Sequence, residues 1–335
     1  MRRPVIAVVG AGSWGTALAI LLAHHGAQVR LWGHLAADIE QLQADRENRQ
    51  FLPGVPLPPG VEPLTDLQAA VAGVDEVLVV VPSHAFRAVA DRLARILAPG
   101  VPVSWATKGF EPETGLLLHE VAAQVLPGRP LAVLSGPSFA GEVARGLPTA
   151  ITVASADRAY AERVAGHLHG ETFRAYTSDD VVGVQVGGAA KNVMAIAAGI
   201  ADGLGFGANA RAALITRGLA EITRLGLALG GRPETFMGLA GLGDLTLTCT
   251  DDQSRNRRMG LALARGLSVA EARAEIGQEV EGVATAREVY RKARALGVEM
   301  PITEQTYRVL YEGLAPLAAV QALLGRRQRP EVDRA

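Results

Sequence analysis

Residues 5–15 read VIAVVGAGSWG, in which five apolar and mostly β-branched residues lead straight into a glycine-rich turn. An unbroken apolar run is typical of a buried parallel strand. The next residues, TALAILLAHHG, have the spacing of an amphipathic helix and end at Gly26, a residue type that commonly terminates helices. The glycines therefore stand between a strand and a helix, which is the setting of a dinucleotide-binding turn.

Each glycine of this turn has a physical reason in such a site. Gly10 allows the tight turn, Gly12 lets a pyrophosphate approach the backbone, and Gly15 lets the helix pack closely on the strand. The phosphates then lie at the N-terminus of the helix, where free N–H groups attract anions. The turn predicts dinucleotide binding, and the alternative is a glycine-rich turn in an ordinary α/β protein.

Length and composition bound the remaining choices. A chain of 335 residues exceeds what one hydrophobic core usually supports, so two domains are expected. With 49% hydrophobic residues and a formal net charge of -1, the chain is globular in composition and has no electrostatic reason to bind nucleic acid or an anionic membrane. Its single cysteine, Cys249, excludes an intrachain disulfide and fits the cytoplasm. No apolar stretch is expected to span a bilayer.

The pattern along the chain changes near residue 180. Before that point, strand-like runs alternate with helix-like segments, and the later strands are expected at 28–32, 77–81, 101–107, 131–134, 149–154 and 172–176. After it the pattern is helical almost to the end. We therefore predict an α/β fold, with a Rossmann-type, mostly parallel sheet that binds the nucleotide in residues 1–180 and an all-α substrate and catalytic domain in residues 181–335.

The residues that follow two of the expected strands indicate which cofactor is bound and how the next helix begins. Residues 28–32 end at Gly33 and His34, where an NAD enzyme usually places a carboxylate for the ribose hydroxyls. None stands there, so NADP and NAD are both admissible and NADPH is favoured. Residues 77–81 end before Ser83 and His84, where an open α/β sheet places ligand-facing loops. The alternative, which is favoured here, is that Ser83 and His84 cap the next helix.

Lysine occurs only at positions 108, 191 and 292, whereas arginine is frequent. Arginine stays protonated while a buried lysine shifts its pKa, so these lysines are candidates for amine chemistry. Lys108 follows the strand at 101–107 and faces the ligand crevice. Lys191 stands among small apolar residues of a helix, which predicts burial, a lowered pKa and a functional role. The alternative is a lysine that snorkels or pairs with a structural carboxylate.

Three further segments carry polar groups suited to an anionic substrate. The small-residue loop 135–140 offers backbone N–H groups, and Arg255 with Asn256 offers a planar guanidinium beside an amide. Three arginines within residues 254–258 fit a solvated face equally well. Asp244 either holds an ammonium group or caps a helix. No grouping of histidine, cysteine and carboxylate residues predicts a metal site.

Several motifs, in this order along the chain, resemble those of the bacterial NAD(P)-dependent glycerol-3-phosphate dehydrogenases. They are GAGSWGTALA, LWGH, VVVPSH, WATKG, SGPSFA, GGAAKN, ITRGLAE, GLAGLGDLTLTCT, SRNRR and GVEMPIT. The resemblance covers essentially the whole chain. It implies a cytoplasmic enzyme that reduces dihydroxyacetone phosphate to sn-glycerol 3-phosphate for glycerophospholipid synthesis, and it admits a homodimer.

The resemblance also implies roles for individual residues. Lys191 would transfer the proton, with Lys108 and Asp244 polarising and orienting the substrate. The implied cofactor contacts are Gly10, Gly12, Ser13, Trp14, Gly15, His34, Lys108, Ala140, Arg255, Glu279 and Glu281. The implied substrate contacts are Lys108, Gly136, Ser138, Lys191, Asn192, Asp244, Ser254, Arg255 and Asn256. Glu279 replaces the small apolar residue expected at its position, so its contact is made by either side chain or backbone.

Two other functions fit parts of the same pattern. A hydroxyacid dehydrogenase with a similar Rossmann-plus-helices plan would place a substrate carboxylate on Arg255 and the loop 135–140. A protein that senses NADP without turnover would need only the glycine-rich turn, and the apolar surroundings of Lys191 argue against it.

Overall fold

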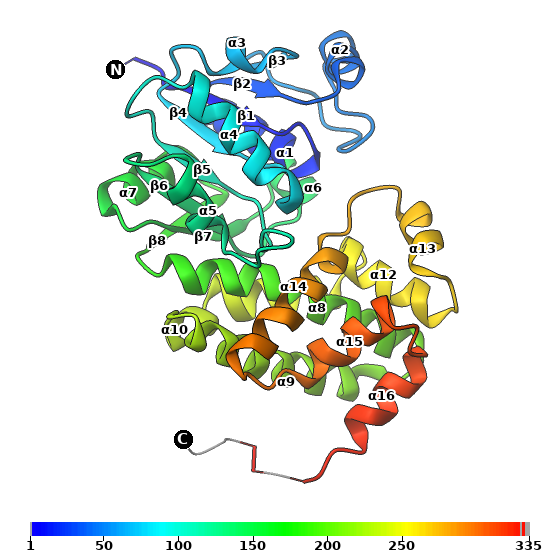
Figure 1. Cartoon of the computed structure of the whole chain (residues 1–335). Helices are drawn as coiled ribbons and strands as arrows, with labels where there is room; N and C mark the ends of the chain where they lie inside the picture. Colours follow the sequence, from blue (N-terminus) through cyan, green and yellow to red (C-terminus); the bar gives the residue numbers. More distant parts are fainter. Residues whose placement is uncertain (1, 329, 332–335) are drawn as a thin grey trace.

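The structure is a computed structural model that describes residues 2–328 and 330–331. A sheet with helices on its faces lies above a group of packed helices (Figure 1). The predicted domain ranges also include residues 1, 329 and 332–335, which lie outside the described part of the chain.

The strands form one sheet in the order β3-β2-β1-β4-β5-β6-β7-β8. Every neighbouring pair is parallel except β6 and β7, so the predicted mostly parallel sheet is confirmed. The strands are β1 (Val5–Val9), β2 (Gln28–Trp32), β3 (Val61–Leu64), β4 (Glu76–Val79), β5 (Val103–Trp105), β6 (Leu131–Ser135), β7 (Thr149–Ala154) and β8 (Phe173–Ser178). The strand order reverses between β1 and β4, the point where open α/β sheets bind ligands.

Sequence reasoning missed β3. It is four residues long, is exposed at alternate positions and contains Pro63. A proline removes a ladder hydrogen bond and is tolerated at a sheet edge, where β3 lies. The other difference is a boundary, since the strand expected over 101–107 spans only the three residues Val103–Trp105.

The helices of the first part cover both faces of the sheet. They are α1 (Ser13–His24), α2 (Ala36–Asp45), α3 (Leu67–Val71), α4 (Phe86–Ile96), α5 (Leu118–Val125), α6 (Ala140–Ala144) and α7 (Arg158–Leu168). A short 3-10 turn, η1 (Ser83–Ala85), precedes α4. The N-cap residues of η1 and α4 are Pro82 and Ala85, and neither makes a side-chain cap. The prediction that Ser83 or His84 caps α4 is therefore wrong, because the Ser83 hydroxyl bonds elsewhere.

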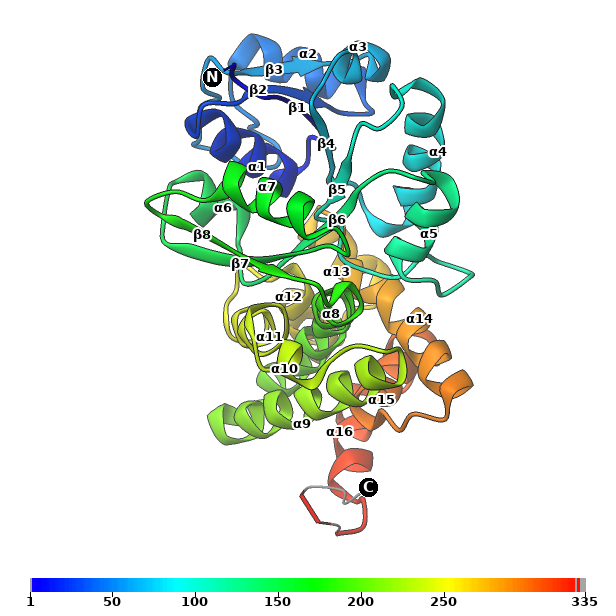
Figure 2. The same cartoon turned by 90° about the vertical axis from the view of Figure 1, so that its left-hand side faces the viewer.

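The second part is helical from residue 181 onward. Its elements are α8 (Val181–Gly203), α9 (Gly207–Ala228), α10 (Pro233–Phe236), the π-helical turn η2 (Leu239–Gly243), α11 (Asp244–Thr250), α12 (Arg255–Ala264), α13 (Val269–Ile276), α14 (Glu281–Leu296), α15 (Pro301–Tyr311) and α16 (Pro316–Leu324). Figure 2 shows α8 directly below the sheet, with α9 and α16 further away.

Helix α8 is the core of this second part. It begins where Asp180 accepts a hydrogen bond from the Gly183 N–H at 2.8 Å, and nearly all of its residues are buried. Glycines let α12 lie close, because a Cβ at Gly260 would stand 2.1 Å from the Ile196 carbonyl oxygen. Among the described residues, α8 is long and apolar enough to pass as a membrane span, a length and composition that were not expected of any stretch. However, 89% of its apolar window is buried inside the protein, as in a core helix.

Candidate active site

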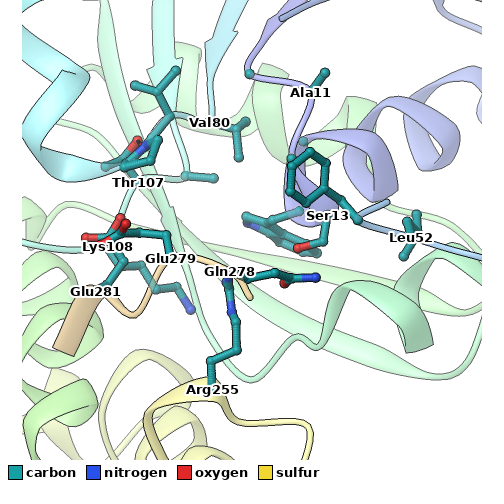
Figure 3. Close-up of a pocket in the computed structure, with 18 of the residues that line it drawn as sticks. Ala11, Ser13, Leu52, Val80, Thr107, Lys108, Arg255, Gln278, Glu279 and Glu281 are labelled. Atoms are coloured by element: carbon teal, nitrogen blue, oxygen red, sulfur yellow. Dashed lines mark hydrogen bonds between the residues drawn. The ribbon is translucent and has the colours of Figure 1, made fainter. Parts of the chain in front are cut away.

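A cavity of about 1280 Å³ separates the carboxyl ends of the parallel strands from the helical part. Residues that follow β1, β2, β4 and β5 line one side, and residues of α8, α12 and the segment before α14 line the other. Figure 3 shows Lys108 and Glu281 on one side of this space, Ser13 and Leu52 on the other, and Arg255 reaching in from below. The cavity therefore lies at the predicted switch point of the sheet.

The glycine-rich turn shapes one end of the cavity. Gly10 has a φ of +128°, and a Cβ there would stand 2.3 Å from the Val80 carbonyl oxygen. A Cβ at Gly15 would stand 1.8 Å from the Gly10 carbonyl oxygen, whereas one at Gly12 would meet nothing within 4 Å. The turn is thus closed on its sheet side and open at the N-terminus of α1, which suits a pyrophosphate.

Two lysines share one carboxylate at the other end. Lys108 and Lys191 each place Nζ 2.6 Å from a different oxygen of Asp244, which is 1% exposed. Lys191 also donates to Thr248 Oγ1 at 2.7 Å, and Lys108 donates to the Gly136 carbonyl oxygen at 3.1 Å. Each ammonium therefore uses two of its three protons in contacts of the described chain, and both side chains line the cavity.

Three elements bring the two lysines, Asp244 and Thr248 together. Lys108 follows β5, Lys191 lies in the middle of α8, and Asp244 opens α11 with Thr248 one turn later. Helix α8 lies close to the sheet because Gly188 has no side chain: a Cβ there would stand 2.4 Å from Ser135 Oγ. Of the two alternatives for Asp244, the geometry favours the ammonium partner, since its side chain caps no helix.

Burial and charge determine the protonation of this group. The predicted burial of Lys191 is confirmed, as it is 7% exposed. Desolvation lowers the pKa of Lys191 to about 8, even though Asp244 opposes the shift and Lys108 adds to it. Desolvation by itself would raise the pKa of Asp244, but Lys108 and Lys191 outweigh it and hold that pKa below its ordinary value. At neutral pH Asp244 is therefore ionised and Lys191 is mostly protonated.

The arginine-rich segment separates into different environments. Arg255 is partly buried and lines the cavity, and its side chain makes no hydrogen bond or ion pair within the part of the chain that the structure describes. Burial lowers its pKa. Arg257 instead pairs with Asp202 at 2.6 Å inside the helical part, and Arg258 is exposed. The solvated-face alternative therefore does not hold for Arg255, whose guanidinium is available to an anion.

The remaining predicted substrate contacts lie around the lysines. Ser138, Asn192, Ser254 and Asn256 line the cavity with Lys108 and Lys191, whereas Gly136 contributes its carbonyl oxygen to Lys108. Ser254 Oγ accepts a bond from the Arg257 N–H and so caps α12. Asn256 Nδ2 donates to Asn192 Oδ1 at 3.0 Å. The two amides are therefore partly committed to each other.

The predicted cofactor contacts spread along the cavity. Those that line it are Gly10, Gly12, Ser13, Trp14, Gly15, His34, Lys108, Arg255, Glu279 and Glu281. Ala140 begins α6 between the lining residues Phe139 and Gly141 and does not itself line the cavity.

Sequence reasoning missed three groups beside the site. Asp38 lines the cavity from the first turn of α2, one helical turn after His34, although no carboxylate was expected near this strand end. Thr248 supports Lys191, and Ser83 bonds Glu281. The spacing of Asp244 and Thr248, four residues apart on one helix face, could have pointed to Thr248. No sequence signal pairs Ser83 with Glu281, which are 198 residues apart.

The cavity residues can be compared with what a dinucleotide and a metal ion each require. The open turn at Gly12 and the long cavity fit a dinucleotide. Among the residues that the structure describes, no group of three or more histidine, cysteine, aspartate or glutamate side chains is placed to hold a metal ion.

The chain is similar to known proteins over nearly its full length. Residues 5–161 match the NAD-dependent glycerol-3-phosphate dehydrogenase N-terminus, and residues 180–321 match the C-terminus of the same family. A glycerol-3-phosphate dehydrogenase [NAD(P)+] from Thioalkalivibrio sulfidiphilus is 60% identical, covering 99% of this chain and 100% of that protein. One from Nitrosococcus oceani is 59% identical, covering 97% and 94%. The crystal structure of glycerol-3-phosphate dehydrogenase from Coxiella burnetii has a TM-score of 0.95 at 48% identity, covering 97% and 99%.

Proposed function

The chain belongs to the NAD-dependent glycerol-3-phosphate dehydrogenase family, and we propose that it reduces dihydroxyacetone phosphate to sn-glycerol 3-phosphate with NADPH or NADH. The observation that carries the proposal is the arrangement of Lys108, Asp244 and Lys191 on the wall of a cavity that is also lined by Arg255, whose guanidinium has no ion-pair partner among the described residues. It combines a proton donor and an anion site within one cleft.

Reduction of a ketone needs a hydride at carbon and a proton at oxygen. The nicotinamide supplies the hydride when it is bound. Lys191 supplies the proton through the N–H that neither Asp244 nor Thr248 takes up. Lys108 offers a second N–H to the same oxygen, which stabilises the charge that develops there. Asp244 holds both ammonium groups in place and favours the protonated form of Lys191.

The two parts of the chain divide the work. We infer that residues 1–180 bind the dinucleotide, with the glycine-rich turn at the pyrophosphate, and that residues 181–335 supply the proton donor and the phosphate site. Within that second part the substrate phosphate is assigned to Arg255 and Asn256, and the loop around Ser138, which belongs to the first part, completes the phosphate site. A cytoplasmic location, a role in glycerophospholipid synthesis and a homodimer belong to the same proposal.

The test is a spectrophotometric assay of NADPH and NADH oxidation with dihydroxyacetone phosphate as substrate. Turnover with this phosphate, and none with a 2-keto acid, is the expected outcome. Turnover with the keto acid alone would favour a hydroxyacid dehydrogenase. Binding of NADPH without any turnover would favour a sensor, which the buried Lys191 argues against.

Arg255→Lys is expected to raise the KM for dihydroxyacetone phosphate by about tenfold, and Arg255→Ala by more, because a hydrogen bond to a charged group contributes about 1.5 to 3 kcal/mol. Lysine keeps the charge but lacks the planar fork. Steady-state kinetics measure the effect, and inorganic phosphate should compete with substrate less well in the alanine variant. Normal KM values in both variants would assign the phosphate to the loop around Ser138 instead.

His34→Asp is expected to shift the ratio of kcat/KM values toward NADH, since a carboxylate after β2 binds ribose hydroxyls and repels a 2'-phosphate. Asp38→Asn should shift the same ratio toward NADPH, because it removes the carboxylate that already lines this end of the cavity. The two ratios are compared with that of the parent enzyme. An unchanged ratio in both variants would place the 2'-position away from these residues.

A further inference from the structure

The Glu281 carboxylate joins the helical part of the chain to the sheet. Glu281 is the first residue of α14, and its two oxygens accept hydrogen bonds from Ser83 Oγ at 2.9 Å and from the Ser83 backbone N–H at 3.3 Å. Ser83 lies after β4, beside the cavity. We call this pair of bonds the Glu281–Ser83 clasp.

The helical side of the clasp is fixed to the substrate site. The Gly282 N–H donates to Asn256 Oδ1 at 2.9 Å, and Asn256 in turn donates to Asn192, the neighbour of Lys191. Packing at this point is tight, because a Cβ at Gly282 would stand 2.5 Å from Asn256 Oδ1. The start of α14 is therefore tied to α12 and to the part of α8 that carries Lys191.

The sheet side of the clasp packs against Gly109, the residue that follows the other lysine. Ser83 is buried, and a Cβ at Gly109 would stand 2.8 Å from the Ser83 Cβ and 3.7 Å from Glu281 Oε2. Gly109 directly follows Lys108, the residue that meets Lys191 at Asp244. The clasp thus connects the segment of Lys108 with the segment of Lys191 by a second route, independent of Asp244.

The surroundings of Glu281 disfavour its ionised form. Burial raises its pKa to about 7, although the hydrogen bonds from Ser83 oppose the rise. A buried carboxyl group costs free energy unless its partners compensate. Its hydrogen-bond donors are both on Ser83, across the cleft, and its charge lies near Arg255. A carboxylate that only stabilised the N-terminus of its own helix would not need a hydrogen-bond partner in the other part of the chain.

We propose that Glu281 is a positioning residue, whose bonds to Ser83 hold the helical part against the sheet and so fix Lys108 and Lys191 at the spacing that the reaction requires. This role goes beyond the cofactor contact that the family resemblance implies for Glu281, and it rests on the proposed dehydrogenase function. The two roles differ in what Ser83 contributes: a clasp needs Ser83, whereas a direct cofactor contact does not.

The test is a double-mutant cycle of Glu281→Ala and Ser83→Ala, with kcat/KM for dihydroxyacetone phosphate, the Kd of NADPH and the thermal midpoint as readouts. Each single variant is expected to lose about tenfold in kcat/KM, the scale of a hydrogen bond to a charged group. Because Ser83→Ala keeps the backbone N–H bond, the double variant should lose no more than Glu281→Ala alone. Glu281→Gln should recover part of the loss, because its amide can still bond Ser83. Ser83→Ala is informative because it leaves the Glu281 charge beside Arg255.

Glu275→Gln is the matched control, since Glu275 lies on α13 and pairs with Arg265 outside the cavity. It should leave all three readouts unchanged. Additive losses, or a loss of NADPH affinity in Glu281→Ala that is absent from Ser83→Ala, would overturn the clasp and favour a direct cofactor contact. A lower thermal midpoint with unchanged kcat/KM would overturn it as well. Parent enzyme without turnover of dihydroxyacetone phosphate would instead contradict the proposed function.

Discussion

Lys191→Met is expected to lower kcat for dihydroxyacetone phosphate reduction by at least about a hundredfold, the usual scale for general acid–base residues. Methionine keeps similar length and apolar bulk in a site that is 7% exposed, so the fold and NADPH binding should be retained. The ammonium that Asp244 and Thr248 orient would be absent. Steady-state kinetics and NADPH titration measure the two effects separately.

The pH dependence of the parent enzyme follows from the same residue. Because the pKa of Lys191 is lowered to about 8, reduction should slow as the pH rises through 8 and the proton donor is lost. Oxidation of glycerol 3-phosphate needs the neutral amine and should accelerate over the same range. Lys292→Met, at a lysine of α14 outside the cavity, is the matched control and should leave turnover unchanged. Near-normal turnover of Lys191→Met would remove Lys191 from the reaction.

The sequence predicted the fold well where local pattern and tertiary role agree. The run at residues 5–15 is a buried strand followed by glycines with distinct steric reasons, so its pattern and its three-dimensional setting coincide. The edge strand β3 was missed because only one of its faces is buried and Pro63 breaks its ladder. The carboxylate of Asp38 was missed because it lies in the first turn of α2 and not at the end of β2. The helical turn returns its side chain to the cavity, and the residues at the strand end do not indicate this.

The sequence identified which residues belong to the site better than it identified which of them bond to one another. Lys191 could be identified because an ammonium among small apolar residues must be buried. The Lys108–Asp244 bond joins residues 136 apart, and nothing in the local sequence encodes that distance. Asn256 and Asn192 were predicted as substrate contacts from resemblance, whereas the structure shows that part of their hydrogen-bonding capacity is spent on each other and on Gly282.

Asp244→Asn is expected to reduce kcat near neutral pH by about a hundredfold or more, although Asp244 itself transfers no proton. The carboxylate is 1% exposed and accepts hydrogen bonds from both lysines at 2.6 Å, so its loss removes the counterion of the buried Lys191 ammonium and of the partly buried Lys108 ammonium. Removing one partner of a buried ion pair costs about 3 to 5 kcal/mol. Lys191 escapes this cost by releasing its proton, so the pKa of Lys191 should fall further below its ordinary value.

The Asp244→Asn variant should recover activity at lower pH and not at higher pH. At neutral pH the Asp244→Asn variant would hold Lys191 largely as the neutral amine, which cannot protonate the substrate. Lowering the pH should restore part of the activity, and the alkaline limb of the kcat profile should move to lower pH. Asp202→Asn, which breaks the buried pair with Arg257 away from the cavity, is the matched control. It should lower the thermal midpoint and leave the limb in place. A limb that stays near pH 8 in Asp244→Asn would show that Asp244 does not set the protonation of Lys191.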